Sequence, residues 1–246
     1  MIDTILLAQE LGRLDKVGIY SPNQLNEYQN NANLTAIYPG RLGKCTGLNG
    51  KLLEYLTKNW ASFDSFTEGK GLEIKSLLES GTPFMGLFYV SLGLSGEMGE
   101  MQEKIMACDD KDSIVGEIGD VYWYISQVCM ELNTPMGYLL NITPSYKTAR
   151  KIIHDPELIK YALLLTCSVW TGRISEITKK LLRDSQGHLH PAKKAMILEN
   201  LTKILIAMRS ICALQDVTPE FCMEKNIEKL FSRKERGKIG GSGDNR

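Results

Sequence analysis

The segment Leu92-Gly-Leu-Ser-Gly-Glu97-Met-Gly-Glu100 is followed, after a sixteen-residue interval, by Glu117-Ile-Gly-Asp120-Val-Tyr-Trp-Tyr124. Each segment carries two carboxylates three residues apart, a spacing that places both on one face of an α-helix. The interval contains a polar, turn-forming stretch at 107–112, so the second helix can fold back antiparallel to the first. These two segments therefore predict a helical hairpin with two pairs of acids facing each other.

Four converging carboxylates repel one another unless a cation offsets their charge. Oxygen ligands favour Mg²⁺, with Mn²⁺ as a substitute, over zinc, which prefers sulfur and nitrogen. We therefore expect Glu97, Glu100, Glu117 and Asp120 to be metal ligands. Glu97 and Glu100 are also the first candidates for a catalytic general base, and the sequence does not separate the two roles.

Acids three residues apart also occur on ordinary solvated helix faces. Here, however, they lie between apolar stretches at 88–94 and 121–125, which we interpret as core. Gly96, Gly99, Gly116 and Gly119 each adjoin an acid, although glycine costs a helix interior about 1 kcal/mol relative to alanine. Close helix approach or a tightly packed metal cluster would account for them.

Helical periodicity dominates the whole chain, and no succession of alternating strands is evident. We therefore expect an all-α helical bundle, with prolines near the helix starts and breaks. The expected helices are 3–14, 22–35, 49–60, 70–80, 84–107, 112–132, 156–183, 191–215 and 218–236.

The composition excludes several classes of function. The 246 residues carry no formal net charge, so nothing global favours nucleic acid or an anionic membrane as a partner. The six cysteines are scattered without a C-x-x-C pair and are typical of reduced thiols in a cytoplasmic protein. The apolar run at the N-terminus is too short to span a bilayer and has an acid where a signal peptide would be basic.

We expect one domain with internal structure. A glycine-rich stretch at 39–84 is interpreted as an insertion, 85–150 as the metal-binding half, and 156–246 as a degenerate second half. In a faint repeat, Glu100 parallels Glu176 and Glu117 parallels Glu199. In the same alignment Arg173 takes the place of Glu97 and Thr202 that of Asp120, so the second half lacks half of the acids.

Three segments together resemble the MazG-like nucleoside triphosphate pyrophosphohydrolases, all-α enzymes related to the dimeric dUTPases. They are Leu25-Asn-Glu-Tyr-Gln with Thr35, the two acid segments, and the ending Asn226-x-x-Lys229-Leu-x-x-Arg233 through Gly240 to Arg246. The resemblance covers roughly 24–38, 85–142 and 170–246. Some ninety residues separate the acid helices from the ending, an interval longer than in typical members.

The resemblance implies Mg²⁺-dependent hydrolysis of a nucleoside triphosphate, in particular a deoxynucleotide, to a monophosphate and pyrophosphate. Because family members assemble as dimers, it also implies a fused pseudo-dimer with one complete site, and it leaves a homo-oligomer open. Asn226, Lys229 and Arg233 form one polar stripe suited to phosphate binding, with a solvated basic helix end as the alternative. Arg246 would help to wrap the phosphates, unless the glycine-rich end is simply a tail.

Other candidates have plain structural alternatives. Lys104 would reach a phosphate or form a surface pair with Glu100. Trp123 and Tyr124 would stack on a base or pack in the core. The pair His188-x-His190 is interpreted as a loop feature. Tyr28, Gln29 and Thr35 are carried over as substrate-side contacts.

Two alternatives remain for the whole protein. The first is a catalytically silent regulatory or scaffold protein that binds nucleotide on the same fold. The second is a carboxylate-bridged di-iron bundle, which is disfavoured because no histidine lies three residues from any of the four acids.

Overall fold

The structure, a computed structural model, describes residues 20–38, 41, 85–144, 156–185 and 189–238. All regular secondary structure within these ranges is helical. Its elements are α2 (Pro22–Asn33), α5 (Met85–Ala107), α6 (Lys111–Glu131), the 3-10 helix η3 (Met136–Asn141), α7 (Pro156–Ser185), α8 (Pro191–Leu214) and α9 (Pro219–Glu235).

The all-α fold is confirmed, and each described α-helix begins and ends within two residues of its predicted bounds. The sequence did not predict η3, whose short 3-10 geometry leaves little periodic signal. The expected helices 3–14, 49–60 and 70–80, and all of the insertion except Arg41, lie outside the described residues.

Local capping explains where α6, α8 and α9 begin. Asp110 caps α6 by accepting a hydrogen bond from the Ser113 amide at 2.9 Å. Thr218 caps α9 in the same way through the Phe221 amide at 3.1 Å. The α8 cap is His190, whose Nδ1 accepts from the Ala192 amide at 3.2 Å. Each cap satisfies an amide that the helix itself leaves without a partner.

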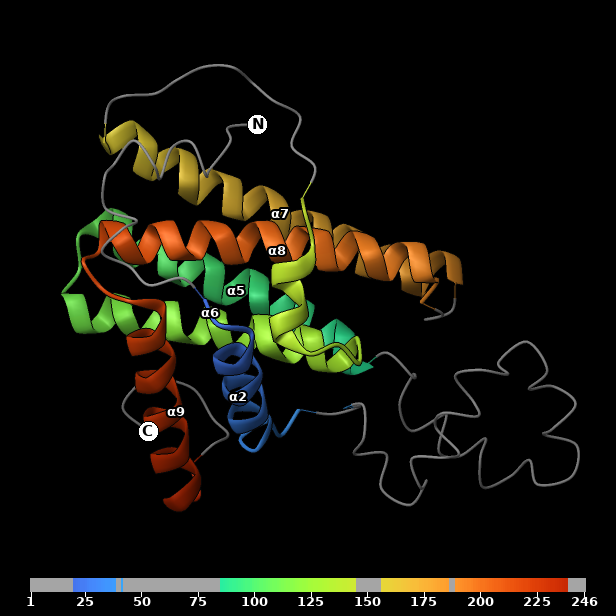
Figure 1. The fold of residues 1–246 in the computed structure, drawn as a ribbon, viewed down its shortest axis with the longest axis horizontal. Coiled ribbons are helices and arrows are strands. Elements are labelled where there is room, and N and C mark those ends of the chain that lie inside the picture. The colour runs from blue at the N-terminus through green and yellow to red at the C-terminus, as the bar shows by residue number, and fades with distance from the viewer. Residues whose placement is uncertain (1–19, 39–40, 42–84, 145–155, 186–188, 239–246) are drawn as a thin grey trace, which may run out of the picture.

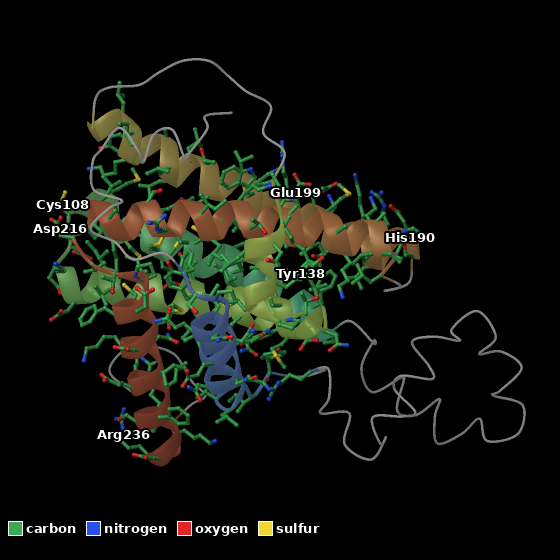
Figure 2. All side chains as sticks on the ribbon, viewed as in Figure 1. Cys108, Tyr138, His190, Glu199, Asp216 and Arg236 are labelled. Carbon is green, nitrogen blue, oxygen red and sulfur yellow. The ribbon has the colours of Figure 1, made fainter. Side chains whose placement is uncertain are left out.

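The four long helices form two hairpins, α5 with α6 and α7 with α8, and the hairpins pack together through α5 and α7 (Figure 1). The shorter α2 and α9 lie side by side against α6 and run across the long helices. The end of the α5/α6 hairpin meets the α8–α9 connection, where Cys108 and Asp216 lie at the same end of the bundle (Figure 2). There Lys111 Nζ donates to the Asp216 carbonyl at 3.1 Å.

The α5–α7 contact is antiparallel and partly polar. Ser91 pairs with Thr178 at 3.2 Å, and Gln102, three turns further along α5, accepts from Ser168 at 2.8 Å. Position numbers thus rise on one helix as they fall on the other. The two hairpins suit the proposed duplication, which remains a prediction.

One hydrophobic core joins both hairpins and includes the fully buried Trp170 and Tyr122. Tyr20 anchors the chain before α2 to this core, because its hydroxyl lies 2.7 Å from that of Tyr122 and donates to the Leu205 carbonyl at 3.0 Å. Within the described residues, no helix has both the length and the apolar character needed to cross a membrane.

Candidate metal centre

The hairpin of α5 and α6 brings Glu97, Glu100 and Glu117 together. One carboxylate oxygen from each lies within 4.8 Å of the others. Glu117 is buried, Glu97 is half-buried and Glu100 is exposed, so the cluster opens from the helix interface toward solvent. Acids from two helices, separated by at least seventeen positions in sequence, thus share one site, as the helix spacing predicted.

Asp120, the fourth predicted ligand, contacts α9. Asn226 Nδ2 donates to Asp120 Oδ1 at 2.6 Å, and Lys229 Nζ lies 2.5 Å from Asp120 Oδ2. The Tyr28 hydroxyl donates to the Asn226 amide oxygen at 3.0 Å, which fixes the orientation of that amide. Two of the residues assigned to the C-terminal stripe therefore lie at the acid cluster, from which they are more than a hundred residues distant in sequence.

Lys104 reaches the same cluster from α5. Its ammonium forms an ion pair with Glu117, whose side chain is 4% exposed. This contact crosses the hairpin, and the alternative of a surface pair with Glu100 stays a prediction. Lys104 and Lys229 thus each place a positive charge on an acid of α6.

The environment of Glu97 disfavours its ionised form. Burial, followed by the negative charges of Asp120, Glu100 and Glu117, raises the pKa of Glu97 to about 8, and Lys229 partly offsets the rise. A carboxyl group with this pKa exchanges a proton near neutral pH. The same carboxyl would be stabilised as an anion by any cation that entered the cluster.

The four glycines beside the acids differ in their surroundings. A Cβ on Gly119 would lie 2.8 Å from Asn226 Cβ and 2.9 Å from the Cys222 carbonyl, so this glycine allows α9 to approach α6. Around Gly96, Gly99 and Gly116 no described atom lies within 4 Å of such a Cβ. Close helix approach therefore accounts for Gly119 but, among the described residues, not for the other three, for which the alternative of a tightly packed metal cluster stays a prediction.

Aromatic side chains adjoin the acids. Tyr124 and Trp123 are half-buried and meet edge to face, with ring centroids 4.8 Å apart. The Trp123 indole donates to Thr35 Oγ1 at 3.1 Å. Both rings therefore have packing roles, and Tyr124 also lies close enough to Glu97 to feel its charge.

The residues carried over from the first helix are internal rather than substrate-facing. Tyr28 bonds to Asn226, and Gln29 Nε2 donates to the Thr134 carbonyl at 3.0 Å. Thr35 donates to the Ala32 carbonyl at 2.7 Å. All three carried-over side chains are buried, so they hold α2 against its neighbours.

The remaining candidates are resolved in part. Arg233 lies on α9 one turn beyond Lys229 and is buried. Arg246 and His188 lie outside the described residues. The capping role of His190, at the opposite end of the bundle from Cys108 (Figure 2), fits its interpretation as a loop feature.

The corresponding positions of the second hairpin hold different chemistry. Arg173 and Glu176 are exposed, and Glu176 pairs with Lys179 and Lys180 on its own helix. Glu199, labelled on α8 in Figure 2, pairs with the buried Lys203 at 2.9 Å. The buried Thr202 donates to the Leu139 carbonyl in η3 at 3.2 Å and to Leu198 in its own helix at 3.0 Å. These contacts need no metal.

A protein of Mycobacterium phage L5 named Gene 37 protein is similar to part of this chain, with 35% identity over 75 residues. The matched segment is 30% of this chain and 66% of the phage protein, so the chain spans just under two thirds of that relative's length. No family model matches the chain. No solved structure matches it.

Proposed function

We propose that this protein is a Mg²⁺-dependent hydrolase that cleaves a nucleoside triphosphate to a monophosphate and pyrophosphate. The resemblance of its motifs favours deoxynucleotides as substrates. The observation that carries the proposal is the convergence of three carboxylates from two helices at a site that two lysines also reach. Acids suit a divalent cation, and lysines suit the oxygens of a phosphate chain.

The donor set fits the proposed metal. Glu97, Glu100 and Glu117 offer oxygen atoms only, which favours Mg²⁺ or Mn²⁺, and Asp120 is held beside them by α9. A bound Mg²⁺ would supply the Lewis acidity that neutralises phosphate oxygens and acidifies water. The raised pKa of Glu97 indicates that a cation would be needed to keep the whole cluster ionised at neutral pH.

The protein's own groups then have distinct tasks. Glu97 is the best placed general base, because it lies half-buried at the cluster and a bound cation would keep its carboxylate ionised and able to accept a proton. Lys104 and Lys229, each paired with an acid of α6, can turn to oxygens of the triphosphate when these arrive. Asn226, fixed by Tyr28, keeps Asp120 oriented.

One observation favours a second candidate, a nucleotide-binding regulatory protein without catalysis. Lys104 and Lys229 already balance part of the acidic charge, so the cluster is partly neutralised by the protein itself. Such a site would bind a metal–nucleotide complex without needing to turn it over.

The two candidates differ in one measurement. The protein is incubated with Mg²⁺ and a panel of deoxynucleoside and ribonucleoside triphosphates and a guanosine tetraphosphate, and pyrophosphate release is followed. Release of pyrophosphate with formation of the monophosphate supports the hydrolase. Nucleotide binding without turnover of any member of the panel would reject the hydrolase in favour of the regulatory protein.

A further inference from the structure

A tyrosine on the same face of α5 as the acids is exposed although it is held in place. Tyr89, Gly93, Glu97 and Glu100 follow one another at spacings of four, four and three residues, so they form one stripe along the helix. At 1.5 Å per residue, Tyr89 stands about 12 Å along the axis from Glu97. The stripe thus has an aromatic end and an acidic end.

The ring of Tyr89 is backed by a second ring. Tyr38 stacks on it with centroids 5.2 Å apart and an interplanar angle of 11°. Tyr38 is 7% exposed, and its hydroxyl bonds to Glu131 Oε1 at 2.7 Å, so this backing ring is anchored in the protein. Tyr89 itself is 43% exposed, which leaves much of its surface open to solvent.

Tyr124 connects this ring to the acids. Besides burial, the nearby Tyr89 raises the pKa of Tyr124, which places the two side chains close together. The ring of Tyr124 lies over Gly93, where any side chain would overlap it, so it occupies the stripe between Tyr89 and Glu97. Burial is the main cause of the raised pKa of Tyr124, and the carboxylates of Glu97 and Asp120 raise it further, which places them within electrostatic range.

An exposed ring with an anchored partner ring is a surface for another flat aromatic group, because stacking buries apolar area without demanding particular hydrogen bonds. A phosphate chain without a base has no aromatic ring to stack on such a surface. A ligand with an aromatic ring at one end and phosphates at the other matches both ends of the stripe. This step rests on the proposed function for the identity of the acidic end.

We propose that Tyr89, backed by Tyr38, is the stacking surface for the purine or pyrimidine base of the nucleotide that binds at the acid cluster. The phosphates then extend past the ring of Tyr124, which covers Gly93, toward Glu97 and Glu100. Stacking discriminates weakly among bases, so Tyr89 contributes affinity more than base selectivity.

The test separates the aromatic end from the acidic end. Binding of a non-hydrolysable α,β-imido deoxynucleoside triphosphate and of inorganic tripolyphosphate, both with Mg²⁺, is measured by calorimetry. Tyr89→Ala should weaken nucleotide binding by about 5- to 150-fold, the equivalent of 1–3 kcal/mol of stacking, and change tripolyphosphate binding less than about twofold. Tyr89→Phe, which keeps the ring, should stay within a few-fold of the parent.

Two variants control for structural effects. Tyr161→Ala removes a tyrosine of similar exposure, 46%, from α7 and should change neither affinity. Tyr89→Leu keeps an apolar group against Tyr38 and serves if the alanine variant does not fold. Unchanged nucleotide affinity in a folded Tyr89→Ala or Tyr89→Leu variant, equal weakening of both ligands, or failure of the parent protein to bind the nucleotide overturns the proposal.

Binding of the imido nucleotide does not depend on turnover. Tyr89-dependent binding without hydrolysis of natural triphosphates would reject the proposed function and retain this inference. Hydrolysis that is insensitive to Tyr89→Ala would retain the proposed function and reject this inference.

Discussion

The α5/α6 and α7/α8 hairpins have the same architecture but differ in how their charged side chains are arranged. In the first, Glu97, Glu100 and Glu117 converge. In the second, the aligned Glu176 pairs with lysines of its own helix, and the aligned Glu199 pairs with the buried Lys203. The second hairpin shows that this architecture packs without a convergent acid cluster.

The acids of the first hairpin are therefore not required for helix packing. The raised pKa of Glu97 indicates that its ionised form destabilises the folded state. Charges that a fold does not need, held close at an energetic cost, are typical of functional sites.

The largest expected effect is on turnover. Glu100→Gln and Asp120→Asn should each lower pyrophosphate release by about 100-fold or more while circular dichroism stays unchanged, because each removes a charge from the cluster. Glu176→Gln, the aligned change in the second hairpin, should leave turnover within about twofold. Full activity in either α5/α6 variant would remove that acid from the site.

The next effect is on stability in the second hairpin. Glu199→Gln should lower the free energy of unfolding by about 2 kcal/mol, because it removes the carboxylate that offsets the charge of the buried Lys203. Denaturation with urea, with parallel measurement of turnover, is the check. A variant as stable as the parent would show that Glu199 does not stabilise the buried Lys203.

The seat of α9 on α6 provides a third contrast. Gly119→Ala should destabilise the protein by about 1–3 kcal/mol, because the new methyl would meet Asn226 and the Cys222 carbonyl. Gly116→Ala, with no described atom nearby, should leave stability unchanged or raise it by up to about 1 kcal/mol. Equal effects of the two changes on the melting temperature would show that α9 does not depend on Gly119.

The smallest expected effect concerns pH. The pKa of Glu97 is about 8 in the folded protein and near 4.3 in an unfolded chain, so the folded state binds the proton more tightly between these values. Stability of the metal-free protein should therefore fall as pH rises from about 4.3 to 8 and level off above. Glu97→Gln should remove this destabilisation. We expect the free energy of unfolding to rise by about 1 kcal/mol at pH 8, which corresponds to a rise in Tm of roughly 2–4 °C.

The measurement for Glu97 is thermal unfolding in chelator at pH 5, 7 and 9. The gap between variant and parent should widen with pH and narrow when Mg²⁺ is added. A gap that stays constant across the three values would mean that Glu97 is not the group whose ionisation opposes folding. Glu176→Gln is again the reference, because Glu176 is an exposed acid.

The features that the sequence predicts depend on residues close together in the chain, whereas the features that it does not predict depend on residues far apart. Helix bounds followed from periodicity, proline and caps such as Thr218, which act over a few residues. The proximity of Glu97 and Glu117 followed from the helical spacing of the acids and from the turn predicted between the two helices. By contrast, no local pattern reports that Tyr28 orients Asn226, or that Tyr38 stacks on Tyr89, because packing between distant segments decides both contacts.

One signal was present but unused. Tyr89 lies eight residues before Glu97 on the same helical face, and Gly93 lies between them. The sequence explained the glycines beside the acids as a group, by close helix approach or a metal cluster, and only contacts in space distinguish Gly119 from Gly116. Residue type alone therefore found the acids and missed the surface beside them.

The ion pairs of Lys104 and Lys229 lower the net negative charge of the acid cluster. Four carboxylates and the ammonium groups of Lys104 and Lys229 leave two negative charges when every acid is ionised, which matches one divalent ion. A second divalent ion would exceed the charge that the protein itself provides. It would have to arrive together with the negative charge of a triphosphate, so occupancy by more than one ion would report the presence of the ligand.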